Sequence, residues 1–344
     1  MRIILDGMGG DNAPAEIVKG AVEASKLIDD EICIVGREEL IHAELKKYKY
    51  DPEKVYVVHA EEVITNDEAP VRAVRSKKDS SLVKGLNMLK DGRGDLFISA
   101  GSTGAMMAGG LFILGRIQGL DRPAIASVYP IIGQHKAALL IDAGANAECK
   151  ADNLLEFGIM GSIYAEKVMK IPNPKIGLVN IGHEEAKGST LTKAAYQLLA
   201  KSHVNFVGNV EAREVPKGAC DVIVCDGFVG NVILKLTEGF GWNVFQMLKQ
   251  KFTEGMKAKI GVVFLMDKMK DLKAEFDYSE YGGAPILGVK GAVVKMHGSS
   301  NAKAVKNTIL KGIPFAKEDV VDIIQNSVLE IEEIIISESD IISE

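Results

Sequence analysis

The strongest constraint on the fold is a series of short apolar, β-branched runs that recur along the chain. Runs of this length and composition are typical of strands that are buried on both faces of a parallel sheet. The sequence therefore predicts eight such strands, at residues 2–6, 31–36, 54–60, 95–100, 137–143, 175–182, 204–210 and 221–227.

Helical patterns separate many of these strands. Apolar residues recur at helical spacing over residues 15–28, 151–168, 190–200 and 318–336. Alternation of strands and helices indicates a layered α/β fold, with a mainly parallel sheet and helices on both of its faces. Because no internal repeat or flexible linker stands out, we expect residues 1–344 to form a single large α/β unit.

One segment breaks this alternation. Residues 234–276 are predicted to form a protruding amphipathic helical hairpin, with a break at Gly255. Between residues 249 and 275 there are seven lysines and four acidic residues, in a chain whose net charge is −6. Such a segment could be a packing or dimerisation helix, or it could lie on anionic lipid. The second interpretation directs lysines such as Lys259 and Lys268 to headgroups and an apolar face to acyl chains, namely Val262, Leu265, Met266, Met269 and Phe276.

Overall charge and cysteine spacing exclude several classes of protein. The net charge of −6 argues against a general nucleic-acid binder, which needs a basic surface. The four cysteines show no CxxC spacing, so we expect neither disulfides nor a zinc site. This pattern is typical of a protein in the reduced cytosol. The first residues do not resemble a signal peptide, and the longest uncharged apolar run, residues 260–266, is too short to span a membrane.

Glycine and polar residues follow five of the predicted strands. Because the carboxyl ends of parallel strands meet at one edge of a sheet, these loops are expected to line one crevice. Glycine allows close approach of the backbone to an anion, so residues 101–104 are predicted to cradle phosphate, although Ser102 and Thr103 could equally cap a helix. The five loops are DGMGGDNAP (6–14), AGSTGAMMAGG (100–110), DAGAN (142–146), NIGHEEAKGST (180–190) and DGFVGN (226–231).

Ionisable residues in and near these loops are candidates for chemistry. Lys187 could hold an anion, and His183 lies in the same loop. His297 stands in the sequence HGSS, before another helical pattern. Asp142 and Asp226 each end a strand, where they could orient a cation or cap a helix. Each of these residues could also be an ordinary loop residue.

Several well-known motifs are absent. A dinucleotide-binding GxGxxG pattern would need a third glycine at the position of Asn12. The chain also lacks a GxxxxGK[ST] phosphate loop, an HExxH metal motif and a GxSxG nucleophile motif. Dehydrogenases of the Rossmann type and P-loop enzymes are therefore disfavoured.

Taken in order, eight motifs resemble one family over essentially the whole chain. The chain is similar to PlsX, the bacterial phosphate acyltransferase family of phospholipid synthesis. The family usually shows SAGNTGA, whereas Ser102 here replaces the asparagine; a hydroxyl can still donate a hydrogen bond, so we expect the role of this position to be kept. The motifs are DGMGGDNAP, SAGSTGA, DRPA, IDAGAN, NIGHEEAKG, CDGFVGN, YGGAPILGVKG and HGSS.

The resemblance implies an activity and a set of partners. A fatty acyl group would move from acyl carrier protein to inorganic phosphate, and a membrane acyltransferase would use the acyl phosphate to acylate glycerol 3-phosphate. The resemblance implies a homodimer, with a fold similar to isocitrate and isopropylmalate dehydrogenases and to phosphotransacetylase. Because phosphate is already a nucleophile and a thiolate leaves readily, the reaction needs no redox cofactor, and no metal is expected. We expect a cytoplasmic enzyme associated peripherally with the inner face of the cell membrane. The lysines of the hairpin could bind anionic lipid or the acidic carrier protein.

Roles for the residues follow as hypotheses. Gly101, Ser102, Thr103 and Gly104 would cradle phosphate, and Lys187 would offset its charge. Asn180 and Asn231 would donate hydrogen bonds, and either His297 or His183 would handle the proton. Asp226 is a further catalytic candidate. Asp6 and Asp11 are expected to hold the glycine turn rather than a metal. The remaining residues predicted to line the crevice are Gly9, Gly10, Asp142 and Asn146.

Three other functions remain open. A decarboxylating dehydrogenase of similar fold would need an arginine cluster near the loops, and few arginines lie there. A phosphotransacetylase-like enzyme would differ only in using coenzyme A thioesters as donors. A non-catalytic membrane scaffold would have no need for five glycine-rich strand ends.

Overall fold

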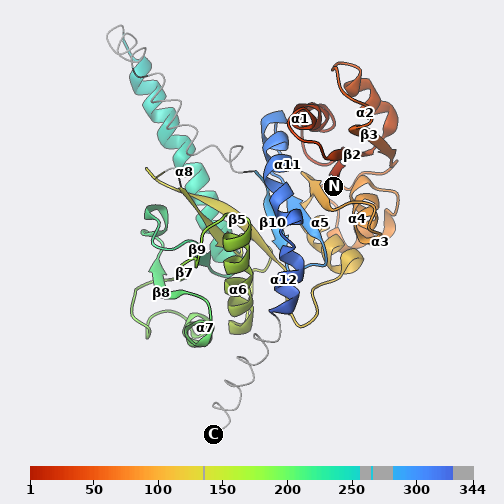
Figure 1. Ribbon diagram of the computed structural model, residues 1–344. Coiled ribbons are helices and arrows are strands. Elements are labelled where there is room, and N and C mark those ends of the chain that lie inside the picture. Colours follow the sequence, from red (N-terminus) through yellow and green to blue (C-terminus); the bar gives the residue numbers. More distant parts are fainter. Residues whose placement is uncertain (135, 256–264, 266–281, 328–344) are drawn as a thin grey trace.

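The computed structural model describes residues 1–134, 136–255, 265 and 282–327. Its centre is a sheet of eleven strands in the order β3-β2-β1-β4-β11-β10-β5-β6-β9-β7-β8 (Figure 1). The strands are β1 (Arg2–Asp6), β2 (Glu31–Gly36), β3 (Val55–His59), β4 (Leu96–Ser99), β5 (Ala124–Ile131), β6 (Lys136–Ile141), β7 (Ile176–Asn180), β8 (Phe206–Glu211), β9 (Val222–Val224), β10 (Ala284–Leu287) and β11 (Ala292–Lys295).

All eight predicted strands are confirmed, and three further strands, β5, β10 and β11, were not predicted. β5 interrupts its apolar pattern with serine, tyrosine and proline. β10 and β11 have four residues each and lie close together in the chain without a helix between them. Short strands in a hairpin give little periodicity, which explains why they were missed.

The sheet changes direction at its centre. β10 is antiparallel to both β11 and β5, and β5 is antiparallel to β6, whereas the other neighbouring strands run parallel. The half that contains β1 and β4 therefore runs opposite to the half that contains β6, β9 and β7. The prediction of a mainly parallel sheet is confirmed. However, the carboxyl ends of the strands lie at two opposite edges, not at one.

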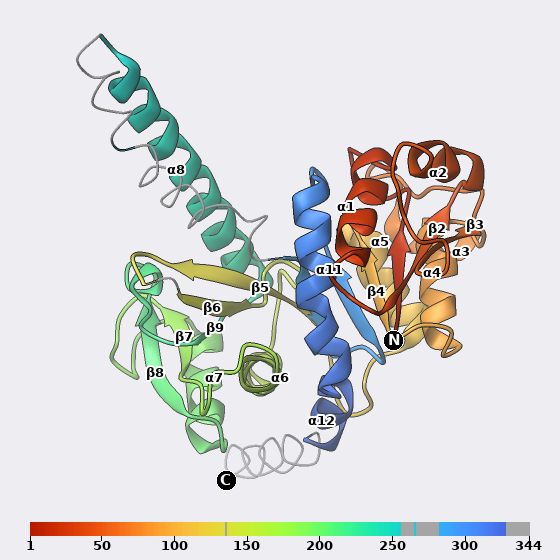
Figure 2. The same cartoon turned by 45° about the horizontal axis from the view of Figure 1, so that its top comes forward.

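Helices cover both faces of the sheet, as predicted (Figure 2). Helix α1 packs against α11, which comes almost 300 residues later in the chain. The structure also has a π-helical turn, η1 (Gly110–Leu114), and a 3₁₀ turn, η2 (Val215–Lys217). The helices are α1 (Ala15–Ser25), α2 (Glu38–Leu45), α3 (Pro70–Ser76), α4 (Ser81–Lys90), α5 (Thr103–Gly109), α6 (Ala151–Lys167), α7 (Thr190–Lys201), α8 (Gly227–Thr253), α11 (Ala302–Lys317) and α12 (Val320–Asn326).

Strand β1 shows why its sequence is apolar throughout. Ile3 and Leu5 belong to the core on the side of α1 and α11, and Ile4 belongs to the core on the side of α4. Successive side chains of a strand point to opposite faces. Both faces are therefore covered, and a run without polar alternation is required.

Helix α8 protrudes from the body of the molecule (Figures 1 and 2). It begins at Gly227 rather than at residue 234 and ends two residues before Gly255, the predicted break. The second half of the predicted hairpin is not confirmed. Of the residues expected to contact lipid or the carrier protein, Leu265 is exposed, and the others lie outside the described residues: Lys259, Val262, Met266, Lys268, Met269 and Phe276.

The predicted helix at residues 318–336 is seen only in part, as α12 (Val320–Asn326), because residues 328–344 also lie outside the described part. Within the described ranges, no helix combines the length and the apolar character needed to cross a membrane.

Candidate active site

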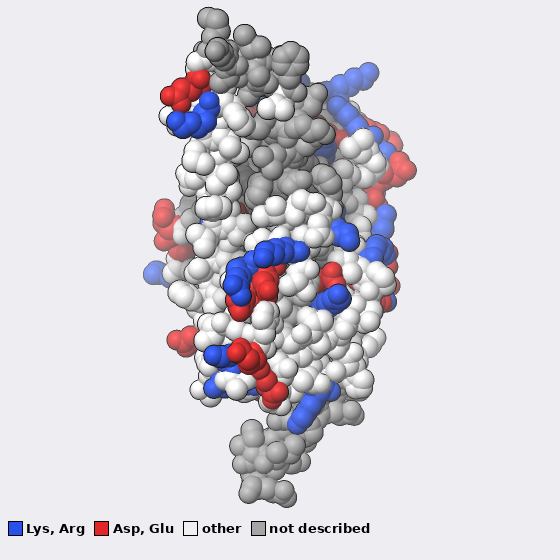
Figure 3. All heavy atoms as spheres, turned by 90° about the vertical axis from the view of Figure 1, so that its left-hand side faces the viewer, with Lys and Arg blue, Asp and Glu red and all other residues white. Residues whose placement is uncertain are grey.

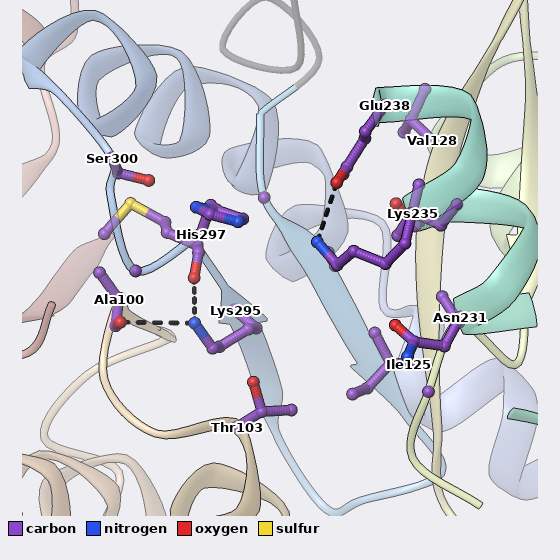
Figure 4. Close-up of a pocket in the computed structure, with 18 of the residues that line it drawn as sticks. Ala100, Thr103, Ile125, Val128, Asn231, Lys235, Glu238, Lys295, His297 and Ser300 are labelled. Atoms are coloured by element: carbon purple, nitrogen blue, oxygen red, sulfur yellow. Dashed lines mark hydrogen bonds and ion pairs between the residues drawn. The ribbon is translucent and has the colours of Figure 1, made fainter. Parts of the chain in front are cut away.

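A cavity of about 450 Å³ lies between the two halves of the sheet. Ala100, Lys295 and His297 lie on one side of it, and Ile125, Asn231 and Lys235 lie on the other (Figure 4). The residues of β10 separate the two sides, and four residues of a strand span only about 13 Å. Loops from opposite edges of the sheet therefore face each other across β10 and β5, which separate β11 from β6 in the strand order.

The loop after β1 supports the first wall from behind. Asp6 is buried, and its carboxylate accepts hydrogen bonds from the N–H groups of Met8 and Gly9 at 3.1 Å and from Ser99 Oγ at 2.6 Å. The backbone N–H of Asp11 donates to the carbonyl of Gly298 at 2.8 Å. Asp6 thus holds the glycine turn, as predicted.

Gly9 and Gly10 allow this loop to pack closely against the loop after β4. A Cβ atom on Gly9 would lie 2.7 Å from the backbone nitrogen of Gly101, and one on Gly10 would lie 2.8 Å from the Cβ of Ala100. Neither glycine lines the cavity in this structure. Their function is to bring one loop against the back of the other.

Of the four residues predicted to cradle phosphate, Gly101 and Thr103 line the cavity. The N–H of Gly101 already donates to Ser99 Oγ at 2.9 Å. Ser102 is the N-cap of α5, and its hydroxyl accepts from the N–H of Ala105 at 3.4 Å. Gly104 is packed on Pro70. Thr103 therefore offers the side chain from this loop that is placed to contact a ligand.

Lys295 ends β11 and reaches into the cavity beside Thr103 (Figure 4). Its ammonium group donates to the carbonyl oxygen of Ala100 at 3.4 Å and to that of Met296. Burial lowers the pKa of Lys295 to about 8, although the charges of Asp6 and Asp11 oppose this shift. The site thus holds a half-buried cation whose pKa is closer to neutrality than that of an ordinary lysine.

His297 lies two residues after Lys295 on the same wall. The backbone N–H of Ser299 is 3.2 Å from its Nδ1, and Ser299 Oγ is 2.8 Å from the same atom. A backbone N–H can only donate, so Nδ1 is the acceptor and Nε2 carries the hydrogen of the neutral ring. Burial, with Lys235 nearby, lowers the pKa of His297, which favours this neutral form.

The opposite wall is built on the first turns of α8. Asp226 caps this helix, and its carboxylate accepts from the N–H of Val229 at 2.8 Å. Asn231 lies one turn further and lines the cavity. Lys235 and Glu238 form an ion pair of 2.8 Å that also lines it. Asp226 is thus a helix cap, and the helix presents the amide of Asn231 and the Lys235–Glu238 ion pair to the cavity.

The loop after β6 is organised by a buried carboxylate. Asp142 accepts from the backbone N–H groups of Ile125, Gly144, Ala145 and Asn146, at 2.7–3.2 Å. Burial raises the pKa of Asp142 while these hydrogen bonds oppose the shift. Asn146 bonds Asp142 and the carbonyl of Pro123 rather than facing the cavity. Both residues hold the loop, and Ala143 and Gly144 line the cavity.

The loop after β7 is not part of this cavity, which corrects the expectation that all five loops line one crevice. The side-chain amide of Asn180 donates to Asn209 Oδ1 at 3.0 Å and to the carbonyl of Lys187 at 3.1 Å. His183 lies 3.1 Å from Glu214. None of the three predicted residues, Asn180, His183 and Lys187, lines the cavity. The reason is the strand order, because β9 separates β7 from β6.

Three residues that line the cavity, Lys295, Lys235 and Glu238, were not predicted from the sequence. A lysine at the end of an apolar run and two residues before the HGSS motif was the available indication for Lys295. Lys235 and Glu238 lie in a helix of ordinary amphipathic composition, so nothing local distinguished them.

The lining of the cavity combines polar and apolar side chains. Thr103, Lys295 and Asn231 offer a hydroxyl, a cation and an amide, which suit an anion. Apolar side chains form much of the remaining lining: Ile125, Val128, Tyr129, Leu234 and Met296. Among the described residues, no group of three or more His, Cys, Asp or Glu side chains could hold a metal ion.

Comparison with known sequences identifies close relatives. A family model described as "Fatty acid synthesis protein" matches residues 1–323. A phosphate acyltransferase from Alkaliphilus oremlandii is 55% identical over 328 residues, which cover 95% of this chain and 97% of the relative. A phosphate acyltransferase from Clostridioides difficile is 49% identical over 322 residues, which cover 94% of each chain.

Comparison with solved structures shows a shared fold. A phosphotransacetylase from Streptococcus pyogenes matches with a TM-score of 0.63 and 16% identity, over 93% of this chain and 94% of that one. A 4-hydroxythreonine-4-phosphate dehydrogenase from Klebsiella pneumoniae matches with a TM-score of 0.54 and 11% identity, over 92% and 99%. The expected similarity to phosphotransacetylase and to dehydrogenase-like α/β folds is confirmed.

Proposed function

Because the chain belongs to the fatty acid synthesis protein family and is an acyltransferase, we propose that it transfers a fatty acyl group from acyl carrier protein to inorganic phosphate. The product, an acyl phosphate, would serve phospholipid synthesis as the donor for a membrane acyltransferase. One observation carries the proposal. A half-buried cation, Lys295, lies with Thr103 on one wall of a cavity that is also lined by apolar side chains.

The chemistry requires little beyond positioning. An oxygen of HPO₄²⁻ attacks the thioester carbonyl carbon, the C–O bond forms, and the carbonyl oxygen becomes a tetrahedral oxyanion. Collapse of this intermediate breaks the C–S bond and releases a thiolate. Holding the two reactants together can contribute about 7–11 kcal/mol to lowering the barrier. Thr103 and Lys295 hold the phosphate, and the amide of Asn231 on the opposite wall donates to the oxyanion.

Lys295 is also suited to the proton transfer. With a pKa of about 8 it is close to the value of about 8.5 for a free cysteine thiol, and such matching favours general acid catalysis. It gives a proton to the departing sulfur and regains one from the phosphate hydroxyl, so the net proton moves from HPO₄²⁻ to the thiol. Neutral His297 donates a hydrogen bond through Nε2.

A second candidate donor is an acyl-coenzyme A. The phosphotransacetylase from Streptococcus pyogenes shares the fold, and the two functions differ in the carrier of the thioester, not in the acceptor. A comparison of the two donors therefore distinguishes them.

The test is an assay of purified protein with acyl carrier protein thioester, with and without phosphate. Free thiol and acyl phosphate, trapped as a hydroxamate, are measured together. We expect equal amounts of both, formed only when phosphate is present. Thiol release at the same rate without phosphate would mean hydrolysis and would overturn the proposal. A higher kcat/KM for acyl-coenzyme A would favour the second donor.

We further propose that two chains associate through α8. Large apolar side chains are exposed along one side of this helix at intervals of four residues: Phe228, Val232, Leu236 and Phe240. The side of the molecule that carries α8 and β8 shows mostly uncharged described residues (Figure 3). An exposed apolar stripe of this kind is typical of an interface.

We also propose peripheral contact with the membrane through a segment that includes Leu265. The side chain of Leu265 is exposed.

A further inference from the structure

Helix α3 presents a surface that the proposed chemistry does not use. The helix buries Ala73 and Val74 and exposes Val71, Arg72 and Arg75. The guanidinium carbon of Arg75 lies 4.9 Å from the centre of the Phe112 ring, in the π-helical turn η1. Phe112 is 52% exposed, and Leu111 beside it is exposed as well. We call these five residues the α3 patch: Val71, Arg72, Arg75, Leu111 and Phe112.

The α3 patch is basic and apolar on a molecule that is acidic overall. The chain carries a net charge of −6. The nearby carboxylate of Glu68 is paired with Lys77 at 2.8 Å, and exposed Asp67 lies before the start of the helix. Arginine and aromatic side chains are the types enriched at protein interfaces, and the cation–π contact holds Arg75 in place before any partner arrives.

The α3 patch lies close to the cavity. Asn66, four residues before α3, lines the cavity. Pro70, the first residue of α3, packs on Gly104, which follows the cavity residue Thr103. The seven residues of α3 extend only about 10 Å from this contact. A partner seated on the patch is therefore within reach of the cavity for a flexible arm.

The basic end of α8 is less suited to this task. Lys249 lies 18 residues after Asn231 on the same helix, which corresponds to about 27 Å. An arm that starts there would have to span that distance before reaching the donor groups of the cavity.

We propose that the α3 patch docks the acyl donor, a small acidic protein that carries the acyl group as a thioester on a long flexible arm. This inference rests on the proposed function and adds the place where the donor binds. The two arginines attract the acidic surface of the partner, and Val71, Leu111 and Phe112 supply the apolar contact. Charge complementarity of this kind accelerates encounter and selects the partner.

The test is a kinetic comparison of two acyl donors, acyl carrier protein and an acyl-pantetheine thioester. It uses the double variant Arg72→Glu with Arg75→Glu, which reverses the charge of the α3 patch. With acyl carrier protein as the donor, we expect kcat/KM to fall at least tenfold. With an acyl-pantetheine thioester, which has the arm but no protein, we expect activity within twofold of the unchanged protein. Lys249→Glu with Lys251→Glu, which makes the same change in charge on α8, is the matched control and should behave like the unchanged protein with both donors.

Each other outcome has a defined meaning. Unchanged kcat/KM with the carrier protein would overturn the inference, as would a loss in the α8 control instead. Reduced binding to vesicles of anionic lipid without a change in donor kinetics would assign the patch to a membrane. If activity falls with both donors, the same comparison of kcat/KM for the two donors is made on the milder double variant, Arg72→Gln with Arg75→Gln. A loss confined to the carrier protein then supports the inference, and an equal loss with both donors overturns it. If the unchanged protein makes no acyl phosphate from either donor, the proposed function itself fails.

Discussion

Lys295 is the residue on which the proposed chemistry depends most. It is half-buried at the end of β11, where its ammonium group lies against the carbonyl oxygens of Ala100 and Met296 and lines the cavity. Lys187, the lysine predicted from sequence, lies in a loop that does not line the cavity. The two lysines therefore give opposite expectations: replacement of Lys295 should impair the reaction, and replacement of Lys187 should not.

Replacing Lys295 with Met, which keeps most of the apolar stem, should lower kcat/KM for phosphate about a hundredfold or more, a loss typical of a positioned electrostatic donor. Lys187→Ala should stay within about twofold. Steady-state kinetics with varied phosphate measure both. A larger loss for Lys187→Ala than for Lys295→Met would show that the active geometry differs from the one described above.

The same lysine predicts a pH dependence. With its pKa lowered to about 8 by burial, Lys295 is charged below that pH and neutral above it. Activity should therefore decline as pH rises through about 8, whereas an ordinary lysine would remain charged to above pH 10. The residual activity of Lys295→Met should lack this decline, and an unchanged profile in that variant would assign the titration to another group.

At the scale of elements, the packing of the β1 loop against the β4 loop depends on Gly9. A Cβ atom there would lie 2.5 Å from Asp6 Oδ2 and 2.7 Å from the nitrogen of Gly101, so Gly9→Ala must displace the loop that carries Thr103. Overpacking of this kind costs about 1–3 kcal/mol of stability. We expect lower thermal stability and a higher KM for phosphate.

Gly239→Ala is the control for this variant, because a Cβ atom at Gly239 in α8 meets no atom within 4 Å. It should leave activity unchanged and should not lower stability. Equal behaviour of the two variants, measured by thermal melting and kinetics, would mean that the contact between the loops is unimportant.

Strands and helices were predictable where their patterns are long. The apolar runs of β1, β2 and β4 predict buried strands because both faces of the sheet are covered. The hairpin of β10 and β11 was missed because strands of four residues carry little pattern. Ser102 shows why the roles of site residues are harder to predict than strands and helices. The same residue suits a phosphate cradle and a helix cap, and the structure shows a cap.

At the scale of the whole molecule, α8 is the element that leaves the body of the fold. Its exposed residues Phe228, Val232, Leu236 and Phe240 form one stripe, and Trp242 and Met247 are exposed further along. A stripe of this kind on a protruding helix predicts association of two chains.

Light scattering coupled to size exclusion should therefore give a mass twice the 37.0 kDa of one chain. Leu236→Glu with Phe240→Glu should shift this mass to that of a monomer, because the two carboxylates would have to be buried at the interface. Lys249→Glu, which lies off the stripe, should remain dimeric. A dimer that persists in the double variant would place the interface elsewhere.

The sequence by itself determined the α/β fold, most of its strands and the family to which the chain belongs, and the last of these is confirmed by relatives about 50% identical. These properties depend on local patterns and on short motifs, which can be recognised in the sequence without the tertiary structure. Only the tertiary structure decided which motifs meet. The antiparallel strands β10 and β5 reverse the sheet, so loops from two opposite edges face each other across these two strands. The β7 loop, with Lys187, is left outside this cavity, and Lys295 is brought into it, because contact between distant segments depends on strand order and direction rather than on local sequence.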